Sequence, residues 1–188
     1  MADFIIKSAA GTGNKTLIQG QDQSDSNYAI QIGDAGVSTL HNATITAGTF
    51  PAGHVLQVVM GDVETGAVTS SSATHATTDL EVAITPSSTS SKILIMLSQT
   101  FDTQASERAV EFALYRDGSI VQDKLGYGYS RASSDGRVIG HFSSNYLHSP
   151  STTSATTYQL YARSPGADTV YTRYSGFAST IIAMEIKG

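Results

Sequence analysis

The chain contains neither cysteine nor tryptophan, and only four of its 188 residues are proline. Without cysteine, disulfide bonds and thiolate metal sites cannot form. Charge is also scarce, because Asp, Glu, Lys and Arg make up 14 % of the chain, and the net charge is −5. Nucleic-acid binding requires clustered Lys and Arg to neutralise phosphates, whereas the eleven basic residues here are scattered. We therefore expect no nucleic-acid partner.

Long hydrophobic segments are missing as well. The first residues, MADFIIK, have no basic start and no long apolar run, so no signal peptide is expected. No stretch approaches the roughly 20 apolar residues of a transmembrane helix. These features predict no membrane partner.

Serine and threonine are the most prominent part of the composition. The sequence has 25 Ser and 22 Thr, about a quarter of all residues, together with 17 Gly. Because 40 % of the residues are apolar and lie in patterned runs, the composition is not that of a disordered chain. It favours β-strands joined by many polar turns.

Apolar residues alternate with other residues in several segments, as in strands that bury one face. The predicted faces are Leu56, Val58 and Met60; Leu80, Val82 and Ile84, before Pro86 ends the run; and Val110, Phe112 and Leu114. Lys92–Gln99, KILIMLSQ, is instead apolar almost throughout. That pattern is typical of a strand covered on both faces.

Turn signals separate these segments from further predicted strands. Asp117-Gly118 is a hairpin signal, because both residues tolerate positive φ. The further strands are Ile120–Leu125, Arg137–Ser143, Thr157–Arg163, Val170–Tyr174 and Ser179–Ile186. The best helix candidate, Thr103–Ala109, is short. The pattern predicts an all-β fold, an antiparallel β-sandwich or jelly roll, with an extended N-terminal β-arm.

The first fifty residues differ from the rest, because their apolar runs are too short to close a core. A boundary at Thr49–Gly53 divides an arm, residues 1–52, from a sandwich domain, residues 53–188. A strand that cannot bury its own face is suited to intertwining with other copies or docking to a larger assembly. The candidate contacts of the arm are Phe4, Ile5, Ile6, Lys15, Leu17 and Ile18.

Residues 8–17 of the arm, SAAGTGNKTL, come close to a phosphate-binding loop. In that motif the lysine directly follows the last glycine, but here Asn14 lies between Gly13 and Lys15. Ser8 stands where the first glycine belongs, and no helical pattern follows. We interpret the glycine pair as a turn and expect no cofactor.

No local pattern indicates a catalytic or metal site. The five histidines, His41, His54, His75, His141 and His148, form no closely spaced pair, so we expect isolated surface or rim side chains. A trimer axis that gathers three copies of one histidine is the open alternative. Facing carboxylates could form a glycosidase pair, but Glu81, Glu111 and Glu185 alternate with apolar residues, which favours a solvated outer face. We therefore expect a protein that is not an enzyme.

Tyrosine is the remaining notable residue type, with nine copies. The segment Leu125-Gly126-Tyr127-Gly128-Tyr129 places two of them between glycines. Exposed tyrosines often mark interfaces or sugar-binding surfaces, although half-buried strand residues fit the pattern equally well. Tyr127 and Tyr129 are the candidate outer-surface contacts.

Several stretches together resemble a known family. ITPSSTSSKILIMLSQ (Ile84–Gln99), LHSPSTTSATTYQLYARS (Leu147–Ser164) and IIAMEIKG (Ile181–Gly188) resemble a jelly-roll domain of structural proteins of tailed bacteriophages, particularly marine ones. GTGNKTLIQGQD and TFPAGHVLQVV resemble segments that often precede it. The resemblance implies a homotrimer on the virion surface, as a capsid cement or decoration protein, a head fibre or a tail-fibre tip.

The expected function is that of a cement protein that stabilises the head by binding the major capsid protein or another virion protein. The alternative is a fibre-tip module, on the head or the tail, that binds a host-surface glycan or protein. A glycan depolymerase is the third hypothesis, for which the sequence offers no carboxylate pair.

Overall fold

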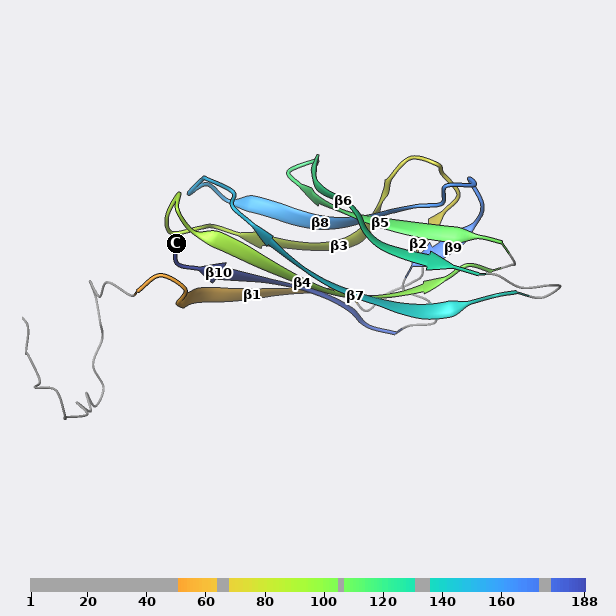
Figure 1. Ribbon diagram of the computed structural model, residues 1–188, viewed down its shortest axis with the longest axis horizontal. Coiled ribbons are helices and arrows are strands. Elements are labelled where there is room, and N and C mark those ends of the chain that lie inside the picture. The colour runs from red at the N-terminus through yellow and green to blue at the C-terminus, as the bar shows by residue number, and fades with distance from the viewer. Residues whose placement is uncertain (1–50, 64–67, 105–106, 131–135, 173–176) are drawn as a thin grey trace, which may run out of the picture. The chain divides into compact units, whose positions relative to one another are not determined.

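The computed structural model describes residues 51–63, 68–104, 107–130, 136–172 and 177–188, which form ten β-strands and no helix. No described residue therefore belongs to a helix that could cross a membrane. The strands form two antiparallel sheets packed face to face (Figure 1). The predicted β-sandwich is confirmed.

The first sheet places four long strands side by side in the order β1 (Val55–Val63), β10 (Ser179–Ile186), β4 (Lys92–Asp102) and β7 (Ile139–His148). Two short strands extend it, since β9 (Val170–Thr172) pairs with the end of β4 and with β2 (Val68–Ser70). The second sheet has the order β3 (Ala76–Ile84), β8 (Thr156–Arg163), β5 (Ala109–Arg116) and β6 (Ser119–Tyr129).

The order of the eight long strands is that of a jelly roll. Apart from the β5–β6 hairpin, each successive long strand lies in the other sheet, so β1 and β10 pair although they lie at opposite ends of the domain sequence. This crossing produces the two Greek keys of the jelly-roll fold.

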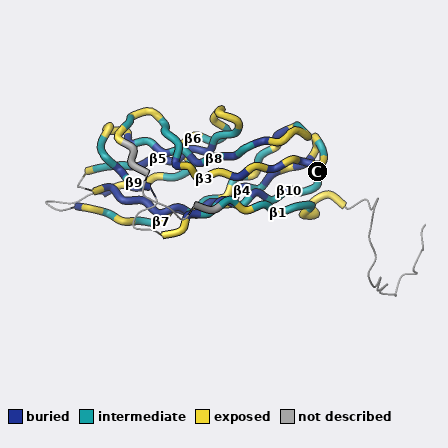
Figure 2. The backbone as a smooth tube through the Cα atoms, turned by 180° about the vertical axis from the view of Figure 1, so that it is seen from behind, coloured by how far each residue is buried: buried dark blue, intermediate teal, exposed yellow. Residues whose placement is uncertain are grey.

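The core lies between the sheets and uses the alternation predicted for β3 and β5, whereas the face predicted for β1 does not face the core, since Val58 and Met60 are 56 % and 60 % exposed. Buried residues alternate with more exposed ones along most strands (Figure 2). The predicted inward residues of β3 and β5 are all at most 3 % exposed: Leu80, Val82, Ile84, Val110, Phe112 and Leu114. Ile93, Ile95, Leu97 and Ile181 face them from the first sheet.

The predicted hairpin is confirmed, with φ of 48° at Asp117 and 78° at Gly118. Asp117 also fixes the neighbouring strand, because its carboxylate accepts hydrogen bonds from the Thr156 hydroxyl at 2.6 Å and the Thr157 amide at 2.8 Å. The helix candidate is wrong in its described part. Gln104 and Glu107 have φ near 60°, a left-handed conformation that a right-handed helix cannot contain.

Strand β6 extends four residues beyond the predicted end at Leu125, to Tyr129. Its two glycines face inward, where aromatic rings occupy the space of their missing side chains. A Cβ at Gly126 would lie 1.9 Å from Phe142 Cε2, and one at Gly128 would lie 2.4 Å from Phe101 Cζ. The glycines therefore serve packing, and the rings of Phe142 and Phe112 stack beneath them with centroids 4.7 Å apart.

Candidate assembly surface

The outward face of the first sheet carries aliphatic side chains in rows that cross its four long strands. Residues directly opposite each other in antiparallel pairing share a face. The rows are Met60, Ile182 and Met96; then Val58, Met184, Leu94 and Leu147; then Val55 and Ile186. We call these nine residues the aliphatic face.

The outer strands β1 and β7 of this face are open to solvent, whereas Leu94, Ile182, Met184 and Ile186 are half-buried. The exposed fraction is 60 % for Met60, 56 % for Val58 and 50 % for Leu147, while the alternate residues of β10, Ile181 and Ala183, are fully buried. Four strands about 4.8 Å apart, over about seven residues at 3.3 Å each, cover roughly 450 Å². A patch of this size is comparable to the largest apolar patch on a typical monomeric protein, and such patches are often functional.

Polar residues border the aliphatic face, and charge lies at its edge. Lys92 stands opposite Ile186 at the end of the third row. Beside Met96 and Ile182, a hollow of about 150 Å³ is also lined by the polar residues Ser98, Ser143, Asn145 and Thr180. An apolar centre with a polar rim is the composition of a protein–protein interface.

The orientation of β10 corrects one interpretation of the sequence. Glu185 was expected on a solvated outer face, but it is fully buried, and its alternate neighbours Met184 and Ile186 point outward. Both faces of this strand are apolar, so alternation alone does not reveal which one faces the core. Glu81 does lie exposed, as predicted, and Glu111 is half-buried in an ion pair with Arg163 at 2.6 Å.

Glu185 is held by donors from one loop, between β3 and β4, and from strand β1. Its carboxylate accepts hydrogen bonds from the Ser87 amide and hydroxyl, both at 2.7 Å, and from Gln57 Nε2 at 2.6 Å. Burial by itself raises the pKa of Glu185, but the Ser91 hydroxyl, Gln57 and Ser87 outweigh it and hold the pKa below its usual value. The ionised carboxylate ties β1 and the loop after β3 to β10.

Replacing this carboxylate should weaken the fold in a pH-dependent way. Because the folded pKa is lowered, its stabilisation is present above the unfolded pKa, near 4.3, and is lost as the pH falls through the folded pKa. Glu185→Gln should therefore lower the free energy of unfolding by about 2 kcal/mol at pH 7, with a smaller difference near pH 3. Urea unfolding at both pH values measures this, with exposed Glu81→Gln as the control. Equal losses at pH 7 and pH 3 would contradict the ionic role.

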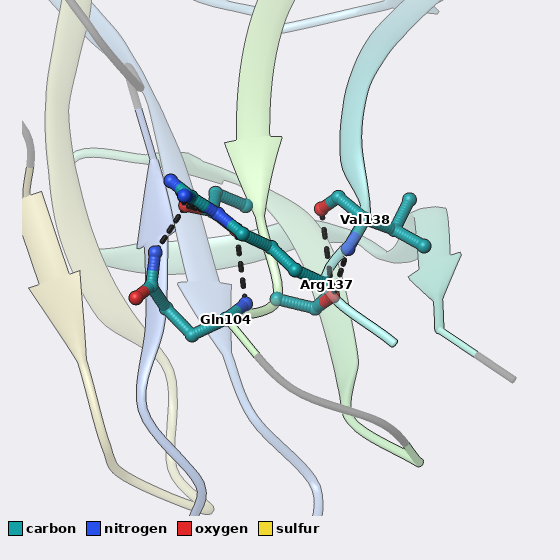
Figure 3. Close-up of polar contacts among 5 residues, drawn as sticks. Gln104, Arg137 and Val138 are labelled. Atoms are coloured by element: carbon teal, nitrogen blue, oxygen red, sulfur yellow. Dashed lines mark hydrogen bonds and ion pairs between the residues drawn. The ribbon is translucent and has the colours of Figure 1, made fainter. Parts of the chain in front are cut away.

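A second buried carboxylate, Asp102, lies where β4 ends. Its partner Arg137 donates to it at 2.7 Å through Nη2, and Gln104 donates from both its amide and its side chain (Figure 3). Burial opposes ionisation of Asp102, but the bonds from Arg137 and Gln104 hold its pKa below the usual value. Thr103 and Val138 exchange backbone and hydroxyl hydrogen bonds beside this pair, so the residues after β4 are fastened to those before β7.

The outward face of the second sheet has a different chemistry. It carries the Glu111–Arg163 ion pair, a stack of Tyr115 on Tyr161 with centroids 3.9 Å apart, and the exposed pair Tyr127 and Tyr129. The two sequence-predicted outer contacts therefore do lie on the surface, on the side of the sandwich opposite the aliphatic face.

The described histidines are spread over the molecule. His75 contacts Tyr115 and Asp123, His141 contacts Ser98, and His148 contacts Tyr158. Among the residues that the structure describes, no three His, Asp or Glu side chains gather as a metal site. His41 and the candidate arm contacts Phe4, Ile5, Ile6, Lys15, Leu17 and Ile18 lie outside the described residues.

The sequence pattern did not locate the aliphatic face. It showed only that the run KILIMLSQ in β4 is apolar almost throughout. No protein-family model matches this chain, and no curated protein matches it.

Proposed function

We propose that this chain is a non-enzymatic structural protein of a phage virion. In this proposal it forms a homotrimer on the particle surface and acts as a capsid cement or decoration protein. The aliphatic face is the observation that carries the proposal. Covering it would remove several hundred Å² of apolar surface from water, at about 25 cal/mol per Å² before the costs of association.

A second copy of the chain is the occupant that the chemistry favours. Two formal charges of opposite sign lie at its borders, Lys92 opposite Ile186 and Asp62 opposite Thr180, so faces of different copies can meet without a cluster of like charges. The run in β4 has the composition of a strand buried on both sides, and among the described residues only its inner side is covered by another layer. The proposal of three copies per assembly, and of a place on the virion, comes from the resemblance to phage proteins. The residues that carry it are Ile84–Gln99, Leu147–Ser164 and Ile181–Gly188.

A cement protein bridges joints between capsid subunits through symmetric copies. Each contact can be modest, because linked sites give avidity. In the proposal residues 1–52 dock to the capsid or intertwine between subunits, with Phe4–Ile6, Lys15 and Leu17-Ile18 as contacts.

Copy number on purified particles tests this function. Quantitative mass spectrometry should find hundreds of copies per particle, whereas a few tens or fewer would indicate a head-fibre or tail-fibre tip instead. Deleting residues 1–20 should abolish particle binding and preserve the sandwich. An unchanged copy number after that deletion would refute the docking arm.

A further inference from the structure

The exposed tyrosine pair on β6 is the strongest feature that an assembly role does not use. The exposed fraction is 60 % for Tyr127 and 43 % for Tyr129. Their rings lie nearly parallel, at 12°, with centroids 6.2 Å apart. Within the described residues neither hydroxyl makes a hydrogen bond, so both rings present polar tips and apolar surface to solvent.

The pair stands on a rigid support. Gly126 and Gly128 alternate with the tyrosines and face inward, directly against the rings of Phe142 and Phe101. Those rings are buried and belong to the core. A strand fixed in this way holds both tyrosines in place before any ligand arrives, which lowers the entropy cost of binding.

Polar groups border the pair. Glu111 lies directly opposite Tyr127 in the β5–β6 register and is paired with Arg163. Arg163 contacts only Oε2 of that carboxylate among the described atoms, so Oε1 is left as an acceptor. The residue opposite Tyr129 is Ala109, which is small. The two tyrosine rings therefore lie beside a hydrogen-bond donor, Arg163, and an acceptor, Glu111, and their surroundings are not an aliphatic patch.

We infer that Tyr127 and Tyr129 form a binding site for a neutral saccharide chain. A pyranose ring offers an apolar C–H face that packs on an aromatic ring, and hydroxyls on its rim that need donors and acceptors such as Arg163 and Glu111. A protein partner would require a larger surface with an apolar centre, which the neighbours of this pair do not supply. The net charge of −5 disfavours acidic saccharides.

This inference does not depend on the proposed assembly role. The tyrosine pair and the aliphatic face lie on outward faces of different sheets, so a subunit joined through one face keeps the other accessible. Loss of one property therefore leaves the other measurable.

Affinity gel electrophoresis of the full chain in soluble dextran, mannan, laminarin and arabinogalactan tests the inference. We expect at least one of these neutral polysaccharides to retard the wild-type chain. The double variant Tyr127→Ala/Tyr129→Ala should weaken that retardation at least tenfold, while the double Phe variant retains most of it. Ile120→Ala, a change at an equally exposed apolar residue of β6, is the matched control and should bind as wild type.

Thermal unfolding of each variant shows whether the fold is intact, since both tyrosines are exposed and their loss should leave the midpoint unchanged. Retardation by none of the four polysaccharides would overturn the inference. Equal retardation of the wild type and the double Ala variant would overturn it as well.

Discussion

Replacing Met60 by glutamate should dissociate the proposed trimer into folded monomers. Met60 is 60 % exposed in the single chain, so the change does little to the sandwich itself. In the assembly the new carboxylate would be buried without a partner, at a cost of about 3 kcal/mol or more per site, which is at least a hundredfold in affinity. Light scattering at micromolar concentration would measure the decrease from the mass of the trimer to the mass of a single chain.

The control places the same charge elsewhere. Ile120 is 50 % exposed on β6 of the other sheet, so Ile120→Glu should leave the trimer intact. Met96→Glu changes the same row of the aliphatic face and should act like Met60→Glu. If both methionine variants kept the mass of the wild-type assembly, the aliphatic face would not be the contact between copies.

Adding one methyl group at Gly126 should destabilise the fold strongly. The new Cβ would lie 1.9 Å from Phe142 Cε2, and that ring cannot move freely because it stacks on Phe112 at 4.7 Å. Overpacking of this kind costs about 3 kcal/mol, or roughly 6–12 °C in melting temperature for a domain of this size. Calorimetry of Gly126→Ala measures the loss.

A second substitution shows whether Gly126→Ala destabilises the fold by overpacking the core or by its effect on the backbone. Combining Gly126→Ala with Phe142→Leu makes room for the methyl group, so the double variant should lose less stability than the sum of the two single changes. A strictly additive loss would show that the ring and the glycine do not share the space between the sheets.

Local alternation predicted the second sheet better than the first. In β3 and β5 the apolar residues occupy one face only, so their pattern identifies the inward side: Leu80, Val82 and Ile84 in one strand, and Val110, Phe112 and Leu114 in the other. In β10 both faces are apolar, and the buried carboxylate of Glu185 occupies the inward one. Its donors Ser87 and Gln57 are distant in sequence, so no local pattern could reveal them.

The candidate site also depends on contacts between residues that are distant in sequence. The run KILIMLSQ predicted that β4 is covered on both faces, whereas in the described structure its outer side is partly exposed, with Met96 37 % exposed. Its partners on that surface, Met60 and Leu147, come from strands that only the jelly-roll crossing brings together. The tyrosines between glycines were recognisable in sequence, but the reason for the glycines, contact with Phe101 and Phe142, depends on long-range packing.

The mass of the wild-type chain in solution tests the central claim most directly. Multi-angle light scattering at micromolar concentration should give about 59 kDa, three times the 19.7 kDa of one chain. Native mass spectrometry of Met60→Glu under the same conditions should then give the single-chain mass. A wild-type chain that remains at 19.7 kDa would contradict the claim that copies of this protein cover one another's aliphatic faces.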